Sequence, residues 1–409
     1  MPITAVRRLF FLFITIFLFA PVICAQTPDK WQERRDAEKG KNPYINCIIE
    51  YKPAPGQFIN IPGIGTSEAA ESIVGGTSGM VSLGNFGGYI IVGFDHTIWN
   101  DPDNPYGVDF TVIGNAVSNS SEPGIVMVMK DENGNGLPDD TWYELKGSSY
   151  DSLSTIHHYS ITYYNPLQPA DVPWTDSERI TGFVKTVPAH SQAYYPSIDN
   201  FPEYPGDEVT FSGTLVSLDI NDSNPQFVRI KPLAYGYADN RPFTNMGPPY
   251  LPDNPKTFDL LEGSGGNAFD IDWAVDEHGN PVELEGIDFI KIYTAVNINA
   301  GWLGEISTEV CGIIDVSPDD ITSASSSKYM PVIQIYPNPA NEYIHIQSPD
   351  NKLITHIEIW DVSGKTMYHH LPAKDDLSIS VSDYPDGIYI IRIMIEGKQV
   401  TRKFVVHKN

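Results

Sequence analysis

The sequence is short of cationic residues. Its 409 residues include 26 lysines and arginines against 52 aspartates and glutamates, which gives a formal net charge of −26 at pH 7. A chain this acidic repels the phosphate backbone of nucleic acids, so we expect no nucleic-acid partner. The excess of carboxylates instead suits divalent cations and helps to keep a secreted protein soluble.

Cysteine is also rare, with three in the chain. Cys24 lies in an N-terminal apolar segment, so Cys47 and Cys311 are the two that remain once this segment is removed. In an oxidising compartment two such cysteines can form a disulfide. Closing so long a loop would stabilise the fold by about 5 kcal/mol in the loop-entropy model. The alternative is two buried thiols, and the sequence leaves both open.

Long apolar runs are missing outside the N-terminus. Residues 1–25 begin with Arg7 and Arg8, continue with an apolar run to Ala20 and end in small residues near Ala25. This is the layout of a secretory signal peptide, and the run is short for a membrane span of about 20 residues. We predict cleavage after Ala25 and a mature chain without a transmembrane segment.

Helical periodicity is scarce, which argues against an α/β fold. Short runs of β-branched and aromatic residues alternate with other residues, and Gly, Pro, Asn and Asp separate the runs, as is typical of strands and turns. Many short strands without intervening helices predict an all-β protein built as a β-sandwich. The clearest predicted strands are 87–94, 109–117, 124–130, 157–165, 208–218, 227–233 and 287–296.

One change in composition divides the mature chain. "SPDDITSASSSKYM" at 317–330 is rich in Ser and Asp with few apolar anchors, as expected of a flexible linker. The predicted segments are a signal peptide at 1–25, a polar lead-in at 26–42, a β-sandwich domain at 43–316, a linker at 317–332 and a small β domain at 333–409.

The last 75 or so residues carry the most specific pattern. It consists of "YPNPA" at 336–340, "IWDVSGK" at 359–365, "DGIYIIRI" at 386–393 and "KFVVHK" at 403–408. This segment resembles the type A C-terminal sorting domain of proteins that the type IX secretion system of Bacteroidetes exports. The resemblance implies a small immunoglobulin-like sandwich, with the type IX machinery as partner. It also implies passage through the periplasm and the outer membrane, removal of the domain, and release or attachment at the cell surface.

The preceding domain also resembles known proteins. The segments are "GGYIIVGFDHTIWN" (87–100), "GVDFTVIGNAV" (107–117), "SEPGIVMVMKDENGNGLPDDTWYEL" (121–145), "GGNAFDIDWAVD" (265–276) and "IDFIKIYTAVN" (287–297). They resemble a group of bacterial cell-surface proteins without an agreed activity, and their order is similar to that of galactose-binding-like jelly rolls. Such proteins sit beside uptake systems for glycans and corrinoids, so the resemblance implies a nutrient ligand.

"DENGNGLPDD" at 131–140 is the candidate metal site. Asp131, Asn133 and Asn135 alternate, so a tight loop can point their oxygens inward, and Asp139 and Asp140 follow. Hard oxygen ligands without Cys or His favour Ca²⁺. The twelfth position is a tryptophan where an EF-hand requires glutamate, which excludes that motif. The alternative is a plain hairpin turn, because "NGNG" is also strong turn chemistry.

Catalytic motifs are absent from the sequence. "GGTSGM" at 75–80 lacks the last glycine of a nucleophile elbow, and the histidines do not show metal-ligand spacings. Asp270 and Asp272 alternate and could share a strand face, which keeps open a glycosidase-like hydrolase that uses paired carboxylates. In so acidic a chain, however, paired carboxylates are also expected by chance.

Two long loops, 194–207 and 234–255, are rich in aromatic residues and proline, with Asp and Asn between them. Sugars and other flat ligands stack on exposed aromatic rings beside amides and carboxylates. Trp99, Trp174 and Trp302 could add further platforms, whereas the alternative is that these aromatic residues fill the core. The predicted ligand-binding residues are Trp142, Tyr194, Tyr195, Tyr235, Tyr237, Asp239 and Arg241, the last as a partner for Asp239 or as an anion contact.

These patterns together predict a secreted, surface-displayed β-sandwich that binds calcium and a carbohydrate or other nutrient. A secreted hydrolase and a purely structural or adhesive surface module are the alternatives.

Overall fold

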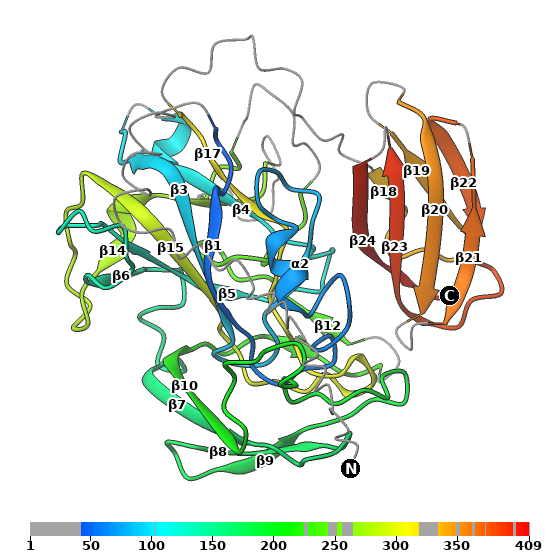
Figure 1. Ribbon diagram of the computed structural model, residues 1–409, viewed down its shortest axis with the longest axis horizontal. Coiled ribbons are helices and arrows are strands. Elements are labelled where there is room, and N and C mark those ends of the chain that lie inside the picture. Colours follow the sequence, from blue (N-terminus) through cyan, green and yellow to red (C-terminus); the bar gives the residue numbers. More distant parts are fainter. Residues whose placement is uncertain are drawn as a thin grey trace, which may run out of the picture.

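The computed structural model describes residues 42–102, 104–224, 228–243, 252–255, 265–318, 334–348, 352–361, 365–372, 374–395 and 398–408. The signal peptide at 1–25 and nearly all of the lead-in and the linker lie outside these residues. The described part is built from antiparallel sheets and one short α-helix (Figure 1). This confirms the all-β prediction. None of its helices has the length and apolar character that a membrane span needs.

A six-stranded antiparallel sheet forms the centre of the larger domain, which we call the central domain (residues 42–318). In spatial order its strands are β1 (Cys47–Lys52), β3 (Tyr89–Trp99), β15 (Gly286–Thr294), β5 (Gly124–Met129), β6 (Trp142–Leu145) and β14 (Ala274–Val275). The middle strand β15 pairs with β3 on one side and β5 on the other, so that Ile290 lies opposite both Val92 and Val128. Three of the predicted strands therefore lie side by side.

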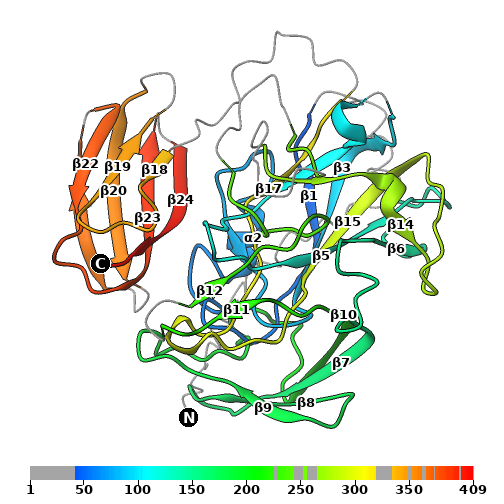
Figure 2. The same ribbon diagram turned by 180° about the vertical axis from the view of Figure 1, so that it is seen from behind.

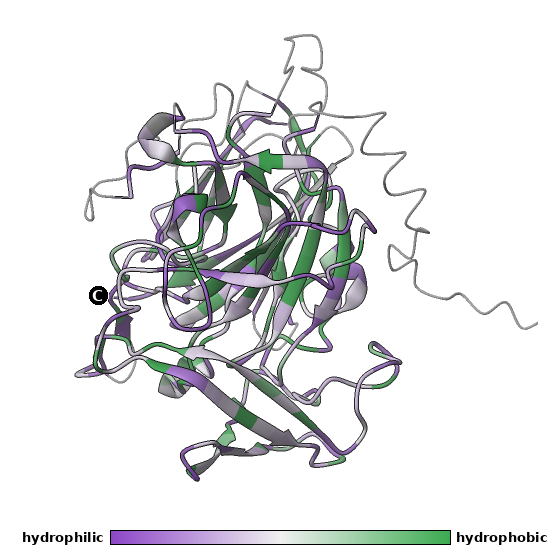
Figure 3. Ribbon diagram, turned by 90° about the vertical axis from the view of Figure 1, so that its left-hand side faces the viewer, coloured by the Kyte–Doolittle hydropathy of each residue, from purple (hydrophilic) through white to green (hydrophobic). Residues whose placement is uncertain are grey.

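One face of this sheet packs against a smaller sheet. That sheet consists of β13 (Asn267–Phe269), β4 (Phe110–Ile113) and β17 (Gly312–Asp315), and a separate pair consists of β2 (Val81–Ser82) and β16 (Glu309–Val310). Ile290 and Ile292, two apart in β15, share a buried cluster with Val112 and Ile313. The period of two in the sequence thus places one side of β15 in a core between two sheets, where Figure 3 shows hydrophobic strands.

The other face of β15 packs on a second group of strands. This group contains the sheet β10 (Glu208–Leu215), β7 (Ile156–Tyr164), β8 (Val172–Asp176) and β9 (Thr181–Val184), and the pair β11 (Ile220–Asn221) and β12 (Arg229–Ile230). The sheet closes one end of the domain (Figure 2). Tyr293 of β15 joins its core with Phe86, Tyr163 and Phe211. The strand predicted at 227–233 is shortened to the two residues of β12.

The α-helix α2 (Ser67–Glu71) is short but well capped. The side chain of Thr66 accepts a hydrogen bond from the backbone N–H of Ala69 at 3.3 Å, which satisfies one of the free amides at the helix start. Ala69 and Ala70 are buried in the main core, so the helix is held beside β1. Three 3₁₀ turns complete the domain: η1 (Pro105–Gly107), η2 (Ile271–Trp273) and η3 (Gly301–Leu303).

The C-terminal domain (residues 334–408) consists of two packed sheets. One contains β18 (Gln334–Tyr336), β19 (Tyr343–Gln347) and β22 (Asp376–Ser380), and the other contains β21 (Thr366–His370), β20 (Ile354–Asp361), β23 (Gly387–Ile395) and β24 (Lys398–Val406). Ile344, Ile357, Ile391 and Phe404 are fully buried between them. The alternation in "GIYIIRIMI" produces this small sandwich as expected.

The C-terminal domain contacts the central domain through β23 and β24. Figures 1 and 2 both show β24 on the side that faces the central domain. Ile390 of β23 packs on an apolar cluster that includes Phe58 and Cys311. Arg402 of β24 donates a hydrogen bond from Nη2 to the backbone oxygen of Thr77 at 3.5 Å. The contact therefore combines apolar burial with polar anchors.

A buried histidine ties β3 to β17. His96 Nδ1 lies 2.6 Å from Asp95 Oδ1, and Nε2 lies 2.7 Å from Asp315 Oδ2. Burial alone would lower the pKa of His96, but the hydrogen bonds and charges of Asp315 and Asp95 outweigh burial and raise this pKa to about 9. His96 therefore carries a positive charge between two carboxylates at neutral pH.

This arrangement predicts a pH-dependent stability. Because the folded pKa lies above the ordinary value of 6.5, the stabilisation is complete below pH 6.5 and is lost as pH rises towards 9. The shift corresponds to about 3 kcal/mol of unfolding free energy. Denaturant unfolding across this range should show a larger loss in the wild type than in His96→Gln. His157→Gln is the matched control, because His157 bonds only to the neutral groups Thr214 and Tyr150. An equal slope in wild type and His96→Gln would contradict the assignment.

Candidate functional site

The predicted metal loop, residues 131–140, connects β5 to β6 near one edge of the six-stranded sheet. The backbone N–H of Asp131 donates to Asp288 Oδ2 at 2.8 Å, and Asp288 lies in β15. Gly134 and Gly136 both have φ of +71°, a conformation that side chains rarely adopt. The central strand thus anchors the start of the loop, and the glycines permit its tight path.

All five predicted ligands are brought together in this loop. The carboxylate of Asp131 accepts the backbone N–H groups of Asn135 at 3.1 Å and of Gly136 at 2.8 Å. The amide of Asn135 lies 3.1 and 3.2 Å from the two oxygens of Asp139. The amide of Asn133 lies 3.3 Å from an oxygen of Asp139 and 3.3 Å from an oxygen of Asp140. The loop therefore gathers carboxylate and amide oxygens of the kind that Ca²⁺ prefers.

Three of the aromatic residues that we predicted to bind ligand are core residues instead. Tyr194, Tyr195 and Tyr237 are 0%, 3% and 1% exposed. Their hydroxyl groups are hydrogen-bonded to the backbone, for example between Tyr195 and Pro205 at 3.0 Å. Rings enclosed in this way offer no face for stacking. Buried tyrosines in a Pro-rich loop fill the space beneath it, and the sequence pattern alone does not separate this role from ligand binding.

Tyr235 and Trp142 remain at the surface. Tyr235 is 38% exposed, and its ring lies 5.2 Å from that of Trp273. Trp142 opens β6 directly after the metal loop and is half-buried against the cluster that contains Cys47 and Phe289. Ligand binding by these two residues stays a prediction.

Arg241 lines a polar groove. Its Nη2 donates to the backbone oxygen of Ala234 at 2.7 Å. The groove has a volume of about 650 Å³. It is lined by Arg241 together with Asn119, Asp219, Asn221, Arg229 and Lys231. Arg229 and Lys231 therefore line the same groove as Arg241, the residue that we predicted to contact an anion.

A second groove, which we call the β1–α2 groove, has a volume of about 710 Å³. It is lined by residues of β1 (48–52), of α2 (67–71) and of the 201–204 segment. The last segment belongs to the predicted aromatic loop at 194–207, so that loop does contribute to a concave surface. The volume is typical of small-molecule sites. Sequence reasoning missed the other two walls, because β1 and α2 are far from this loop in the chain.

The β1–α2 groove has an aromatic wall and an acidic rim. Tyr51 and Phe201 lie edge to face with ring centroids 5.7 Å apart. The Tyr51 hydroxyl donates to the backbone oxygen of Ser82 at 2.5 Å, which fixes its ring. Burial raises the pKa of Glu71. The charged residues of the lining are Glu50, Lys52, Glu68, Glu71 and Glu203.

A third feature is a buried cluster of carboxylates, Glu122, Asp239 and Glu309 (the carboxylate cluster). One ligand atom from each of the three lies within 4.8 Å of the others. They are 6%, 0% and 0% exposed. Asp239, predicted to contact ligand, is therefore enclosed. Its Oδ1 accepts the backbone N–H groups of Asn115 and Ala116, both at 2.7 Å.

The C-terminal domain supplies the cation for this cluster. Lys403 of β24 places Nζ 2.5 Å from Glu122 Oε2 and 3.2 Å from Glu309 Oε2, and its side chain is 3% exposed. Burial by itself lowers the pKa of Lys403, but the charges of Glu122 and Glu309 outweigh it and raise this pKa. Burial and the nearby charge of Glu309 raise the pKa of Asp239 to about 7, against the lowering effect of Lys403. Lys403 is thus held charged among groups that burial drives towards neutrality.

Asp270 and Asp272 do not share a strand face. β13 ends at Phe269, and Asp270 caps the 3₁₀ turn η2 by accepting the backbone N–H of Asp272 at 2.8 Å. Asp272 in turn accepts the side-chain amide of Asn100 at 2.7 Å. The prediction of a shared strand face was wrong, because the chain turns where strand alternation was assumed. The two carboxylates serve local structure in this arrangement.

Cys47 and Cys311 are buried and are not joined by a disulfide, which is the second of the two alternatives left by the sequence. Cys47 packs with Met129 and Phe289, whereas Cys311 lies in the cluster beneath the C-terminal domain. Because the two thiols occupy different apolar clusters, no disulfide closes the domain. Burial raises the pKa of Cys311 to about 12, which makes it unreactive.

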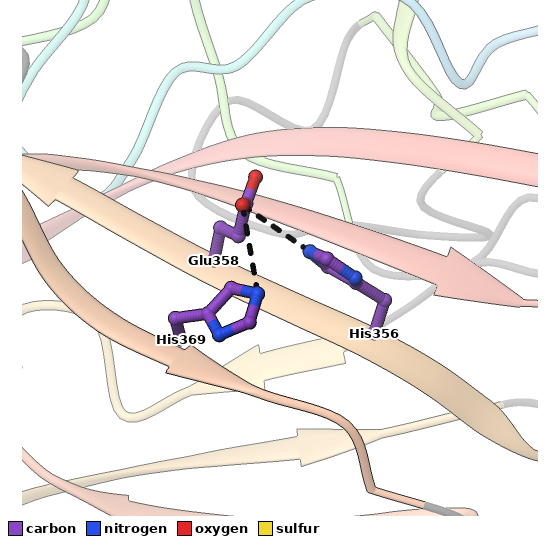
Figure 4. A group of neighbouring side chains, drawn as sticks. All are labelled: His356, Glu358 and His369. Atoms are coloured by element: carbon purple, nitrogen blue, oxygen red, sulfur yellow. Dashed lines mark ion pairs between the residues drawn. The ribbon is translucent and has the colours of Figure 1, made fainter.

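One more group of potential ligands lies on the C-terminal domain (Figure 4). Both His356 of β20 and His369 of β21 point towards Glu358, with Nε2 at 3.3 and 3.9 Å from Oε1. Arg392 Nη1 lies 3.7 Å from the other oxygen of Glu358. Since a guanidinium already shares this carboxylate, we interpret the group as an ion-pair network at the surface.

Comparison with known proteins identifies the C-terminal domain. Residues 334–407 match the family described as the secretion system C-terminal sorting domain. The match covers the two-sheet domain from β18 to β24. It agrees with the resemblance seen in the sequence motifs, and it does not extend to the central domain.

The other comparisons add little. No curated protein matches the chain. Among solved structures, the chain is similar to PorZ, an essential bacterial surface component of the type IX secretion system of Porphyromonas gingivalis, at 11% identity. The alignment covers 74% of this chain and 38% of that one, so this chain spans less than half of PorZ. The TM-score of 0.16 is too low to carry a structural argument.

Proposed function

We propose that this chain, which carries a C-terminal sorting domain and travels through type IX secretion to the cell surface or the extracellular space, binds calcium and a carbohydrate. The observation that carries the proposal is the β1–α2 groove. Its aromatic wall and polar rim are the features by which proteins hold sugars. The ligand class follows from the charge of that rim.

The rim of the groove favours neutral or amino sugars over acidic ones. Glu50, Glu68, Glu71 and Glu203 surround the groove, with Lys52 as the cation of its lining. Carboxylates accept hydrogen bonds from sugar hydroxyls and attract ammonium groups, whereas they repel uronic acids and sulfated sugars. Tyr51, which is half-buried and packs against the buried ring of Phe201, is the aromatic residue on which a sugar ring would lie.

Calcium would act on the loop at 131–140 as a structural ion. The loop places the carboxylates of Asp131, Asp139 and Asp140 in one tight turn, and the side chains of Asn133 and Asn135 contact Asp139 and Asp140. An ion there would neutralise these carboxylates and fix the loop in front of Trp142. A fixed loop would in turn hold Trp142 in one position at the surface.

The groove proposal predicts a binding preference that substitutions remove. In a glycan screen we expect the secreted protein to bind neutral or amino sugars and to reject acidic ones. Glu68→Ala and Glu203→Ala should each weaken binding by about tenfold, as expected for the loss of a hydrogen bond to a charged group.

Glu277→Ala is the matched control for the groove, because it removes an exposed carboxylate at a distant turn and should bind as the wild type does. Affinity is measured by titration calorimetry with the best glycan of the screen. Binding that survives both rim substitutions would place the ligand elsewhere. A screen in which no sugar class binds would favour a structural or adhesive surface module.

The loop proposal predicts a modest calcium-dependent stabilisation. Extracellular calcium modules have dissociation constants of about 10⁻⁴ to 10⁻³ M, and a tenfold excess of ion then adds about 1.4 kcal/mol. For a domain of this size the melting temperature should rise by about 2–4 °C. Asp131→Ala should abolish the rise, whereas Asp139→Ala and Asp140→Ala should reduce it less, because either aspartate can substitute for the other.

Melting is compared in millimolar calcium and in chelator, with Asp276→Ala as the control. Asp276 is a half-buried aspartate that shapes a similar short turn by accepting the backbone N–H groups of His278 and Asn280. An equal melting temperature in calcium and chelator, with no binding heat, would leave the loop as a plain turn.

A further inference from the structure

The carboxylate cluster contains more acidic side chains than the ammonium group of Lys403 can pair with. Glu122, Asp239 and Glu309 supply three carboxylates, and Lys403 supplies one ammonium group. Removing paired charges from water is costly even when they balance, and an uncompensated buried charge is more costly still. If all three carboxylates are ionised, two negative charges are in excess with Lys403 in place and three without it, and burial opposes this excess by raising the pKa of Glu122 and of Asp239.

The cluster is built by rigid parts of the central domain. Glu309 begins β16, and its backbone N–H donates to Asp239 Oδ2 at 2.9 Å. The backbone N–H of Glu122 donates to the backbone oxygen of Asp239 at 3.0 Å. Gly114 packs so closely that a Cβ there would lie 2.2 Å from Asp239 Oδ1. The carboxylate of Asp239 and the backbone of Glu122 and of Glu309 are therefore held by the central domain itself.

Two further observations indicate a ligand for this cluster. The first is that a cationic group, the ammonium group of Lys403 from the C-terminal domain, already lies within hydrogen-bond distance of Glu122 and Glu309. The second is Asn115, which is 7% exposed and donates its backbone N–H to Asp239. Its side-chain Oδ1 is buried without a hydrogen-bond partner among the described residues. A buried amide oxygen in that state is unusual unless an ion or water serves it.

We propose that Glu122, Asp239 and Glu309 form a divalent-cation site of the calcium class, which Lys403 keeps closed while the C-terminal domain is docked. Carboxylate and amide oxygens without nitrogen or sulfur ligands are the donor set for Ca²⁺. A divalent ion in place of the ammonium group would also leave one negative charge in excess instead of two. The site is separate from the loop at 131–140 and does not depend on the groove.

The test uses the full chain without its signal peptide, in an Asp131→Ala background that removes the loop site. Ca²⁺ is titrated calorimetrically into this parent and into Lys403→Ala. We expect Lys403→Ala to bind one equivalent of calcium at least about tenfold more tightly than the parent does. Adding Glu309→Gln to Lys403→Ala should remove this gain.

Arg402→Ala is the matched control. Arg402 precedes Lys403 in β24 and contacts the central domain at Thr77, so this change weakens the same interface while it leaves the ammonium group in the cluster. We expect no calcium gain from it. An equal gain in Arg402→Ala and Lys403→Ala would overturn the specific role of Lys403.

Folding is measured in parallel, because Lys403→Ala leaves the buried carboxylates without a counter-ion. Folded yield should rise when calcium is present during refolding and should not rise with magnesium, which requires stricter geometry. Lys403→Ala/Glu122→Gln lowers the buried charge and should fold without calcium. The proposal is overturned if calcium neither binds to Lys403→Ala nor restores its yield, and the cluster takes up protons instead.

Discussion

The pairing of β15 with β3 and β5 is the constraint on which the central domain depends. Both edges of β15 are hydrogen-bonded and both faces are buried, so its neighbours have little freedom. On the β3 side the sheet continues to β1, which forms a wall of the β1–α2 groove. On the β5 side it continues into the loop at 131–140, whose first backbone amide bonds to Asp288 of β15. One strand therefore positions both proposed binding features.

Much of this framework could be predicted because it is encoded locally. Segments such as 124–130 and 287–296 are short runs rich in apolar and β-branched residues, as expected of strands buried on both faces, and they fold as β5 and β15. The C-terminal domain could be recognised because its motifs are contiguous. The loop ligands from Asp131 to Asp140 also lie within a few residues of one another, so their spacing in the sequence already sets their proximity in space.

Features formed by distant segments could not be predicted in the same way. The β1–α2 groove joins segments near residues 50, 70 and 201, and no spacing in the chain relates them. Tyr194 and Tyr237 have the composition of a binding loop, yet they fill the core because the loop folds back over its own rings. Asp270 and Asp272 show strand-like alternation, but the chain leaves β13 at Phe269 to form a 3₁₀ turn. A local sequence pattern carries no information about packing between segments that are distant in the chain.

The position of Lys403 also fixes the order in which the interior of the protein can be completed. Lys403 follows Glu122 by 281 residues and Glu309 by 94 in the chain. During synthesis from the N-terminus, the residues of the central domain emerge well before those of β24. In that interval its buried carboxylates must hold protons or bind other cations. Docking of β24 is then a late and separate step in maturation. The charge state of the carboxylate cluster therefore differs before and after the C-terminal domain has docked.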